Sequence, residues 1–245
     1  MKKHLFLLLS VFNSLLLFAQ GQEIVVQEPV YLTPNYDSLK IQIADPKSRY
    51  YYPELLRRFA AADTTLEIDQ VHALYYGAIF QPNFNPYQSF DQYESINKIL
   101  GRRRILSSDK AYGKKLLNCV KLTDEIIAQK TTELKVYRYK NAVVRCLSKL
   151  SLCDPQLVSD TRAQYLLLFS AVTASGNGVD FEHAYHLAST MDSYEIMYIY
   201  DFSPVSQSLQ FHEGRAYDVF QLAKNKYQVE ALYFDVTECL KSMQP

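Results

Sequence analysis

Residues 165–187 read YLLLFSAVTASGNGVDFEHAYHL, and the spacing of the apolar side chains changes in the middle of this stretch. Before the glycines, four large side chains recur at the three- and four-residue spacing of a helix: Tyr165, Leu168, Phe169 and Val172. After Gly176-Asn177-Gly178, larger residues alternate with smaller or polar ones from Phe181 to Leu187, which predicts a strand. The stretch therefore divides a helical part, residues 34–174, from a mainly β part, residues 175–245.

Toward the N-terminus, the helical spacing recurs in further segments. It predicts helices at 36–44, from Pro53 onward, at 68–77, at 92–100, at 112–127 and at 136–150. Thr64-x-x-Glu67 and Ser89-x-x-Gln92 have the spacing of capping boxes at two of the starts. We expect the central helices to be antiparallel and stacked, similar to tetratricopeptide hairpins, although the 34-residue consensus of that repeat is not evident.

Toward the C-terminus, the chain has the pattern of a β-sheet. Strand-like runs cover 206–211, 217–222 and 229–236, with natural turns at 212–215 and 224–226. Helices followed by an antiparallel sheet predict the α+β fold class. We expect residues 34–245 to form a single domain.

The first residues have the pattern of a secretory signal. Lys2 and Lys3 precede an apolar run from Leu5 to Phe18, and Ala19 is a small residue at the expected cleavage point. We therefore expect a signal peptide at 1–19, a leader segment at 20–33 and an exported protein, either periplasmic or secreted. After the signal, no apolar run reaches the length of a membrane helix, so we expect no membrane span in the mature chain.

Charge is unevenly distributed along a chain whose formal net charge is +0. Residues 98–150 contain 14 basic against 4 acidic side chains, and they include Arg102-Arg103-Arg104. Such a segment would attract an anionic envelope component. Alternatively, it points charge at water or docks on the acidic segments on either side. Nucleic acid is a poor partner for an exported chain without a nucleic-acid-binding motif.

Four cysteines are present, and their pairing is open: Cys119, Cys146, Cys153 and Cys239. A Cys119–Cys146 bridge is one possibility, because these residues lie at similar distances on either side of the turn near Lys130. Buried free thiols are the alternative, since a core of this size needs no disulfide.

The sequence does not indicate a particular chemistry. His183 and His186 would share a face on a helix and could then hold a metal, but on the predicted strand they point to opposite faces. Gly176-x-Gly178 lacks the lysine and the following helix of a phosphate loop. We therefore assign no catalytic, cofactor-binding or metal residues and expect no cofactor.

Four residues are candidates for an interaction site: Tyr75, Tyr76, Tyr87 and His186. Tyrosine combines a large apolar face with a polar tip, so it suits both binding grooves and cores. The helical spacing of Tyr75 and Tyr76 favours core packing, whereas a groove for glycan or peptide is the functional alternative.

The chain also resembles a known family through motifs spread over most of its length. These are SRYYYPELLRRF at 48–59, DTTL at 63–66, LYYG at 74–77, FNPY at 84–87, SGNG at 175–178, AYHL at 184–187, SQSL at 206–209, YDVF at 217–220 and LYFDV at 232–236. They are similar to domain of unknown function 4919, a family of exported proteins of Gram-negative bacteria. Asn177 and Ser193 stand where that pattern has acidic residues. The resemblance implies export and one α+β unit, and it implies no mechanism.

Two functional hypotheses follow. The first is a non-catalytic, exported binding or envelope-associated module that contacts a protein or an anionic envelope component. The second is a hydrolase-like enzyme that uses His186 with polar groups brought close by folding. A cleft where His186 meets a second polar group would favour the enzyme, and an exposed patch or groove would favour the binding module.

Overall fold

The computed structural model describes residues 30–82, 84–101 and 110–242. The expected signal peptide at 1–19 lies outside the described residues, as do residues 20–29 of the expected leader and Arg102-Arg103-Arg104. In the part of the chain that is described, no helix has both the length and the apolar character needed to cross a bilayer.

Helices occupy most of the described residues between Tyr36 and Thr173. They are α1 (Tyr36–Ala44), α2 (Tyr52–Ala60), α3 (Ile68–Gly77), the 3-10 helix η1 (Ala78–Phe80), α4 (Gln92–Leu100), α5 (Lys110–Gln129), α6 (Leu134–Lys149) and α7 (Pro155–Thr173). Pro53 and Pro155 lie in the first turns of α2 and α7, where a missing N–H is tolerated. Each helix that the apolar spacing predicts is present, which confirms the helical part.

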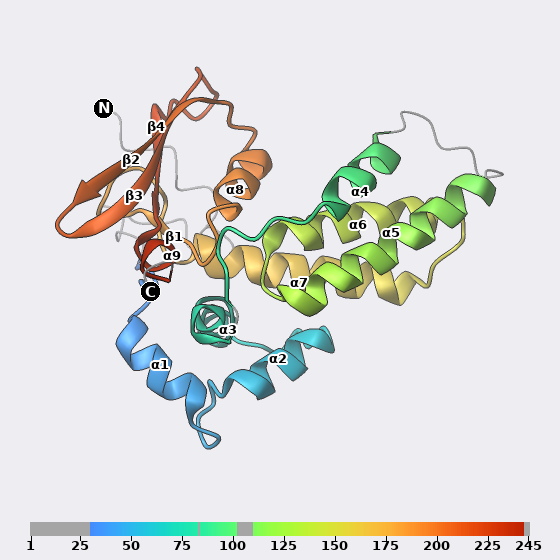
Figure 1. Cartoon of the computed structure of the whole chain (residues 1–245), viewed down its shortest axis with the longest axis horizontal. Helices are drawn as coiled ribbons and strands as arrows, with labels where there is room; N and C mark the ends of the chain where they lie inside the picture. The colour runs from blue at the N-terminus through green and yellow to red at the C-terminus, as the bar shows by residue number, and fades with distance from the viewer. Residues whose placement is uncertain (1–29, 83, 102–109, 243–245) are drawn as a thin grey trace, which may run out of the picture.

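Helices α4 to α7 form one side of the molecule, which we call the helical arm (Figure 1). Within it, α6 packs against both α5 and α7. Helix α3 packs against α7 and also contacts α1 and α2. Therefore α3 lies at the junction between the helical arm and the rest of the chain.

The sheet follows the helices and contains β1 (Tyr185–His186), β2 (Pro204–His212), β3 (Arg215–Leu222) and β4 (Ala231–Asp235) in the order β1-β4-β3-β2. Helix α8 (Asp192–Tyr200) precedes β2, and α9 (Thr237–Lys241) follows β4. β2 and β3 form a hairpin whose two turn residues, Glu213 and Gly214, have positive φ values of 48° and 75°. This turn geometry matches the natural twist of paired strands.

The start of the sheet corrects the sequence-based expectation. Only Tyr185 and His186 of the segment 181–187 form a strand, and this strand pairs with β4 in parallel, so the sheet is mixed rather than antiparallel. The preceding residues turn because the N–H groups of Asn177 and Gly178 both donate to the carbonyl of His183, at 2.9 and 2.7 Å. The alternation of apolar side chains from Phe181 to Leu187 therefore does not mark a continuous strand, because the residues before Tyr185 form an irregular turn.

The two expected capping boxes are also wrong. The box before α3 is formed by Glu67 and Gln70. Thr64, the expected cap, lies in the preceding turn together with Thr65, whose N–H donates to the Asp63 carboxylate at 2.9 Å. Helix α4 begins after Asp91, which makes no side-chain cap bond.

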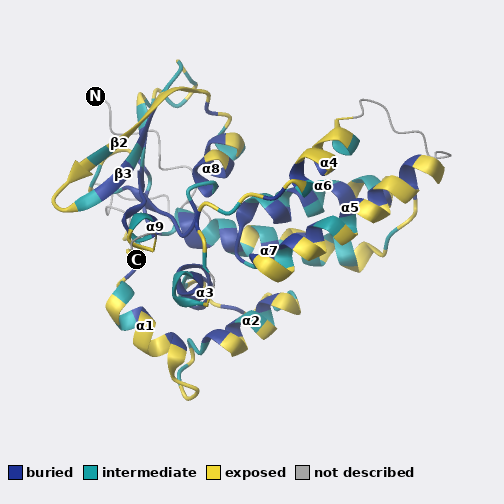
Figure 2. Cartoon of the chain, viewed as in Figure 1, coloured by how far each residue is buried: buried dark blue, intermediate teal, exposed yellow. Residues whose placement is uncertain are grey.

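The core joins the helical and β parts. Buried apolar side chains from Leu39 to Cys239 form one connected cluster, visible as the dark blue interior of Figure 2. A smaller cluster of Ala184, Tyr217 and Val219 lies apart from it. All four cysteines are free thiols, so the Cys119–Cys146 bridge is not formed, and Cys119 and Cys239 are buried.

Candidate functional site

His186 lies in β1, and its backbone forms hydrogen bonds that connect the sheet to the helices. Its N–H donates to Ser175 Oγ at 2.9 Å, and its carbonyl accepts from Tyr76 Oη at 2.9 Å. The side chain of Tyr76 is 0% exposed, and His186 is 7% exposed. These contacts join β1 to the end of α7, 11 residues earlier, and to α3, 110 residues earlier.

The imidazole ring of His186 faces an ion pair. Arg215 Nη2 lies 3.5 Å from His186 Nδ1, and Arg215 Nε donates to Asp235 Oδ2 at 2.5 Å. Burial lowers the pKa of His186 to about 4, with Asp235 opposing this shift and Arg215 adding to it. The ring is therefore neutral at pH 7 and has a lower affinity for a proton than a general base usually needs.

Tyr75 is also 0% exposed and forms a separate set of hydrogen bonds. Its hydroxyl donates to Asp192 Oδ2 at 2.5 Å and accepts from the N–H of Ala188 at 3.3 Å. The other oxygen of Asp192 accepts from the N–H of Leu134 at 3.2 Å. Burial raises the pKa of Asp192 to about 8, although the hydrogen bond from Tyr75 opposes the shift.

More buried polar groups surround Asp192. Tyr93 Oη donates to Glu133 Oε1 at 2.6 Å, and Lys130 Nζ donates to Ser189 Oγ at 3.0 Å. Lys130 Nζ also lies 3.4 Å from Glu133 Oε2. We call Tyr75, Tyr93, Lys130, Glu133, Ser189 and Asp192 the buried polar network. Because its groups are paired within the fold, the network specifies packing.

The fourth candidate residue, Tyr87, is apart from this interior. It is 41% exposed and lies in the loop that precedes α4. The structure thus brings Tyr75, Tyr76 and His186 together inside the core, with the rings of Tyr75 and Tyr76 4.8 Å apart, and leaves Tyr87 at the surface. A role of these four residues in an interaction stays a prediction.

The histidine pair does not converge either. His183 Nδ1 lies 2.8 Å from Asp180, whereas His186 faces Arg215. Across the described residues, no group of three or more His, Cys, Asp or Glu side chains is arranged to hold a metal ion.

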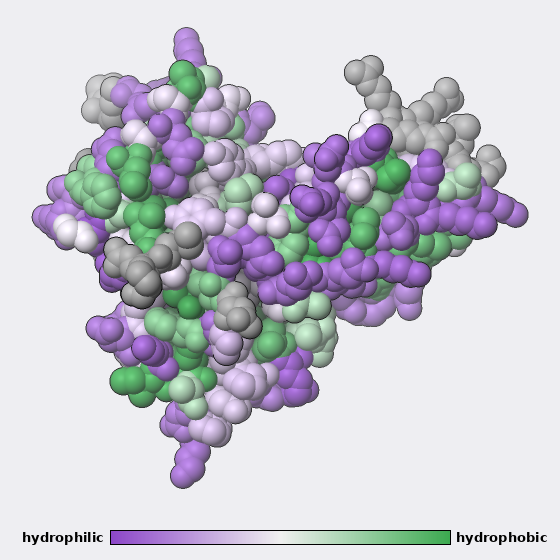
Figure 3. Space-filling model, in the orientation of Figure 1, coloured by the Kyte–Doolittle hydropathy of each residue, from purple (hydrophilic) through white to green (hydrophobic). Residues whose placement is uncertain are grey.

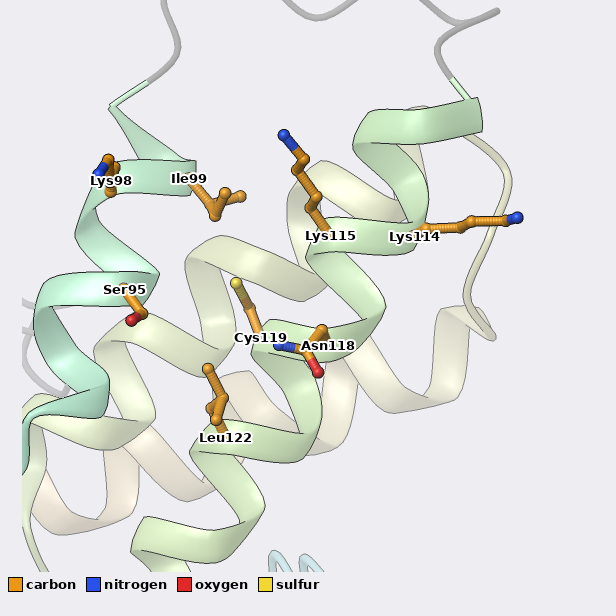
Figure 4. A pocket seen from close by; sticks show the side chains of 8 residues that line it. All are labelled: Ser95, Lys98, Ile99, Lys114, Lys115, Asn118, Cys119 and Leu122. Atoms are coloured by element: carbon orange, nitrogen blue, oxygen red, sulfur yellow. The ribbon is translucent and has the colours of Figure 1, made fainter.

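A groove lies on the surface of the helical arm. It has a volume of about 450 Å³ and lies between α4 and α5. We call it the α4–α5 groove, and its lining residues are Ser95, Lys98, Ile99, Lys114, Lys115, Asn118, Cys119 and Leu122. Figure 4 shows Ile99 and the sulfur of Cys119 pointing into the space between the helices, with Lys115 at its rim. The groove therefore combines an apolar floor with amines at its edge.

The charge around this groove is positive. The first twelve residues of α5, 110–121, include four lysines and no acidic residue. Within the described residues, Lys98, Lys114 and Lys115 form no ion pair, so their charges are available to an anion. Burial raises the pKa of Cys119, so its thiol stays neutral and acts as apolar lining.

Sequence reasoning identified the basic segment but did not identify the groove, Asp192 or the Arg215–Asp235 pair. The four lysines of residues 110–121, which have no acidic residue among them, were the feature of the sequence that indicated a positively charged surface here. Asp192 lies at the start of α8, and a local pattern does not show that it meets Tyr75, 117 residues away.

Comparison with known proteins gives one match. The model of the family described as Domain of unknown function (DUF4919) matches residues 37–244. Searches of curated proteins and of solved structures find no match to this chain.

Proposed function

We propose that this chain, which belongs to the DUF4919 family, is an exported, non-catalytic module that binds an anionic envelope component in the α4–α5 groove. The lysine-edged groove is the observation that carries this proposal. Its volume of about 450 Å³ is in the range of small-molecule sites. The two parts of its lining fit a ligand with an apolar portion and a negatively charged group.

Electrostatic attraction supports the choice of ligand. Lys98 comes from α4, whereas Lys114 and Lys115 come from α5, so an anion in the groove would neutralise charge from two helices. Each amine near a protein surface contributes modestly, but several positive charges around one groove raise the association rate of an anion. Ile99 and Leu122 would cover the apolar portion of the same ligand.

Export is supported by the sequence of residues 1–19 and is part of the proposal. The test is expression of the full-length chain in a Gram-negative host, followed by fractionation and mass spectrometry of its N-terminus. A periplasmic or secreted product that begins at Gln20 is the expected result. A full-length product in the cytoplasm would contradict export.

The alternative hydrolase has weaker support. His186 is nearly buried, its ring faces Arg215, and its low pKa makes it a poor base at neutral pH. We therefore favour the binding module over an enzyme that uses His186.

Titration calorimetry with dodecyl phosphate below its micelle concentration tests the groove. Lys115→Glu should weaken binding about tenfold, because the change replaces an attraction at the rim with a repulsion. Lys121→Glu is the matched control, since Lys121 is exposed on the same helix and does not line the groove. It should alter binding by less than about twofold.

Inorganic phosphate is the second probe. It should bind more weakly than dodecyl phosphate, because it leaves the apolar floor uncovered. Equal losses in Lys115→Glu and Lys121→Glu would mean that the protein binds anions through its general surface charge. Either this result or the absence of dodecyl phosphate binding would reject the proposed site.

A further inference from the structure

Strand β2 is an edge of the sheet along its whole length. The strand order β1-β4-β3-β2 leaves β3 as its partner on one side and no described strand on the other. Eight of its nine residues are exposed. The opposite edge, β1, is only two residues long. One edge is therefore short, and the other offers a long row of backbone donors and acceptors.

The β2 edge carries few of the features that usually prevent strands from pairing. Residues 204–211 include no charged side chain, and its irregularity is confined to the Pro204–Ser206 end. Exposed edges in monomeric proteins commonly carry lysines, inward-pointing charges or central bulges. An uncharged strand of this length accepts another uncharged strand without electrostatic repulsion.

Apolar side chains occur at alternate positions of this edge. Val205 is 71% exposed, Leu209 is 47% exposed and Phe211 is 72% exposed. Residues two apart in a regular strand lie on the same face, so Leu209 and Phe211 share one face, and Val205 is a further exposed apolar side chain at the irregular end of the strand. Figure 3 shows hydrophobic surface over the region of the β2–β3 hairpin, in contrast to the mostly hydrophilic helical arm.

We infer that β2 is a homodimerisation strand that pairs antiparallel with β2 of a second copy, with the two-fold axis at Ser208. This register pairs the regular residues Ser206 to Gln210 of both copies. It also brings Val205, at the irregular end of one strand, near Phe211 of the other copy, so the exposed apolar residues at the two ends meet apolar side chains. Ser208 then lies opposite its own copy.

The pattern of backbone groups permits this register. His212 and Arg215 flank a two-residue turn and pair with each other, so the even-numbered residues of β2 direct their backbone groups toward β3. In the regular part of the strand, the odd-numbered residues Gln207, Leu209 and Phe211 direct theirs to the open side. In the proposed dimer, Gln207 pairs with Leu209 of the other copy, and both are odd-numbered.

A second copy fits this edge better than a charged partner does. Residues 204–211 have no charges to attract an acidic or basic peptide. The same strand in a second copy is uncharged, is equally long and carries its apolar residues at matching positions. Identical surfaces of this kind close into a two-fold dimer.

Sedimentation equilibrium of the mature chain, with Ser208 variants, tests the inference. Wild type should dimerise reversibly, and Ser208→Lys should weaken the dimer about fivefold, because like charges would then face each other at the axis. Mixing Ser208→Lys with Ser208→Glu should restore the dimer by pairing opposite charges. Ser206→Lys is the matched control, since Ser206 is exposed on the same face but would lie opposite Gln210.

A second experiment tests the register without changing charge. Ser208→Cys should give a covalent dimer on mild oxidation, identified by mass spectrometry as a peptide linked through position 208. A monomeric wild type would overturn the inference, and it would mean that another segment or another protein covers β2. Equal weakening by Ser208→Lys and Ser206→Lys, or a dimer without the 208–208 link, would overturn it as well.

Discussion

Tyr75→Phe is expected to destabilise the fold strongly, although it removes only one oxygen atom. That oxygen donates a hydrogen bond to Asp192 and accepts one from the N–H of Ala188, in a region without solvent exposure at Tyr75 or Asp192. Loss of the hydroxyl leaves a buried acceptor and a buried donor without this partner. Each unsatisfied buried group costs about 1–3 kcal/mol, so the expected loss of unfolding free energy is roughly 3 kcal/mol.

Tyr76→Phe is the matched control, because Tyr76 is the adjacent residue and is equally buried. Its hydroxyl donates a hydrogen bond to the carbonyl of His186 and also interacts with the hydroxyl of Ser175. Ser175 keeps its hydrogen bonds to Val172 and His186 when the Tyr76 hydroxyl is removed, so the loss should cost about 1 kcal/mol. Both variants remove the same atom from the same helix, so the comparison isolates the partners of the hydroxyl.

Urea unfolding of the mature chain, followed by far-ultraviolet circular dichroism, measures both losses. For a chain of this length, a loss of roughly 3 kcal/mol also corresponds to a decrease in Tm of about 6–12 °C. The m-value should not change, because the surface exposed on unfolding stays the same. If Tyr75→Phe costs no more than Tyr76→Phe, the hydrogen bonds of Tyr75 are not what stabilises this region.

Three further predictions concern other buried groups. In the wild type, rising pH between about 4 and 8 should lower stability through Asp192, because the unfolded chain loses this proton near its usual pKa of 3.8 while the folded chain keeps it to about 8. Asp192→Asn should flatten urea midpoints over that range, and parallel profiles would contradict the raised pKa. Gly176→Ala should cost about 2–3 kcal/mol, because its added Cβ would lie closer to the backbone carbonyl oxygens of His183 and Ala184 than van der Waals contact allows. An unchanged Tm would refute this clash. Maleimide should label Cys153 but not Cys239 in the native protein, because Cys239 is 0% exposed and burial raises the pKa of its thiol; rapid native labelling of Cys239 would show local opening.

Much of the fold was predictable because helices and paired strands repeat their apolar spacing locally. The expected bounds of α1, residues 36–44, are those observed, and the β2–β3 hairpin lies where the turn at Glu213-Gly214 indicates. The failure at 181–187 has a local cause. Hydrogen bonds to the carbonyl of His183 replace strand pairing, and apolar alternation does not distinguish the two.

The candidate sites were less predictable because they depend on contacts between distant residues. The abundance of tyrosine identified Tyr75 and Tyr76 but not their partners, Asp192 and His186, more than 100 residues away. The α4–α5 groove depends on the separation of two helices, and only its lysines were visible in the sequence. The spacing of apolar residues predicts individual helices and strands, whereas a site depends on how those helices and strands are arranged in space.

The contact between Tyr75 and Asp192 also affects how the chain folds during its synthesis. The two residues are 117 positions apart, so α3 cannot complete its surroundings until the ribosome has made α8. At about 5–20 residues per second, this interval lasts roughly 6–23 s. Throughout it, the N-terminal helices lack the later half of their core. A chain that completes its core so late emerges with its N-terminal helices not yet packed against their final partners, which is compatible with the export proposed above.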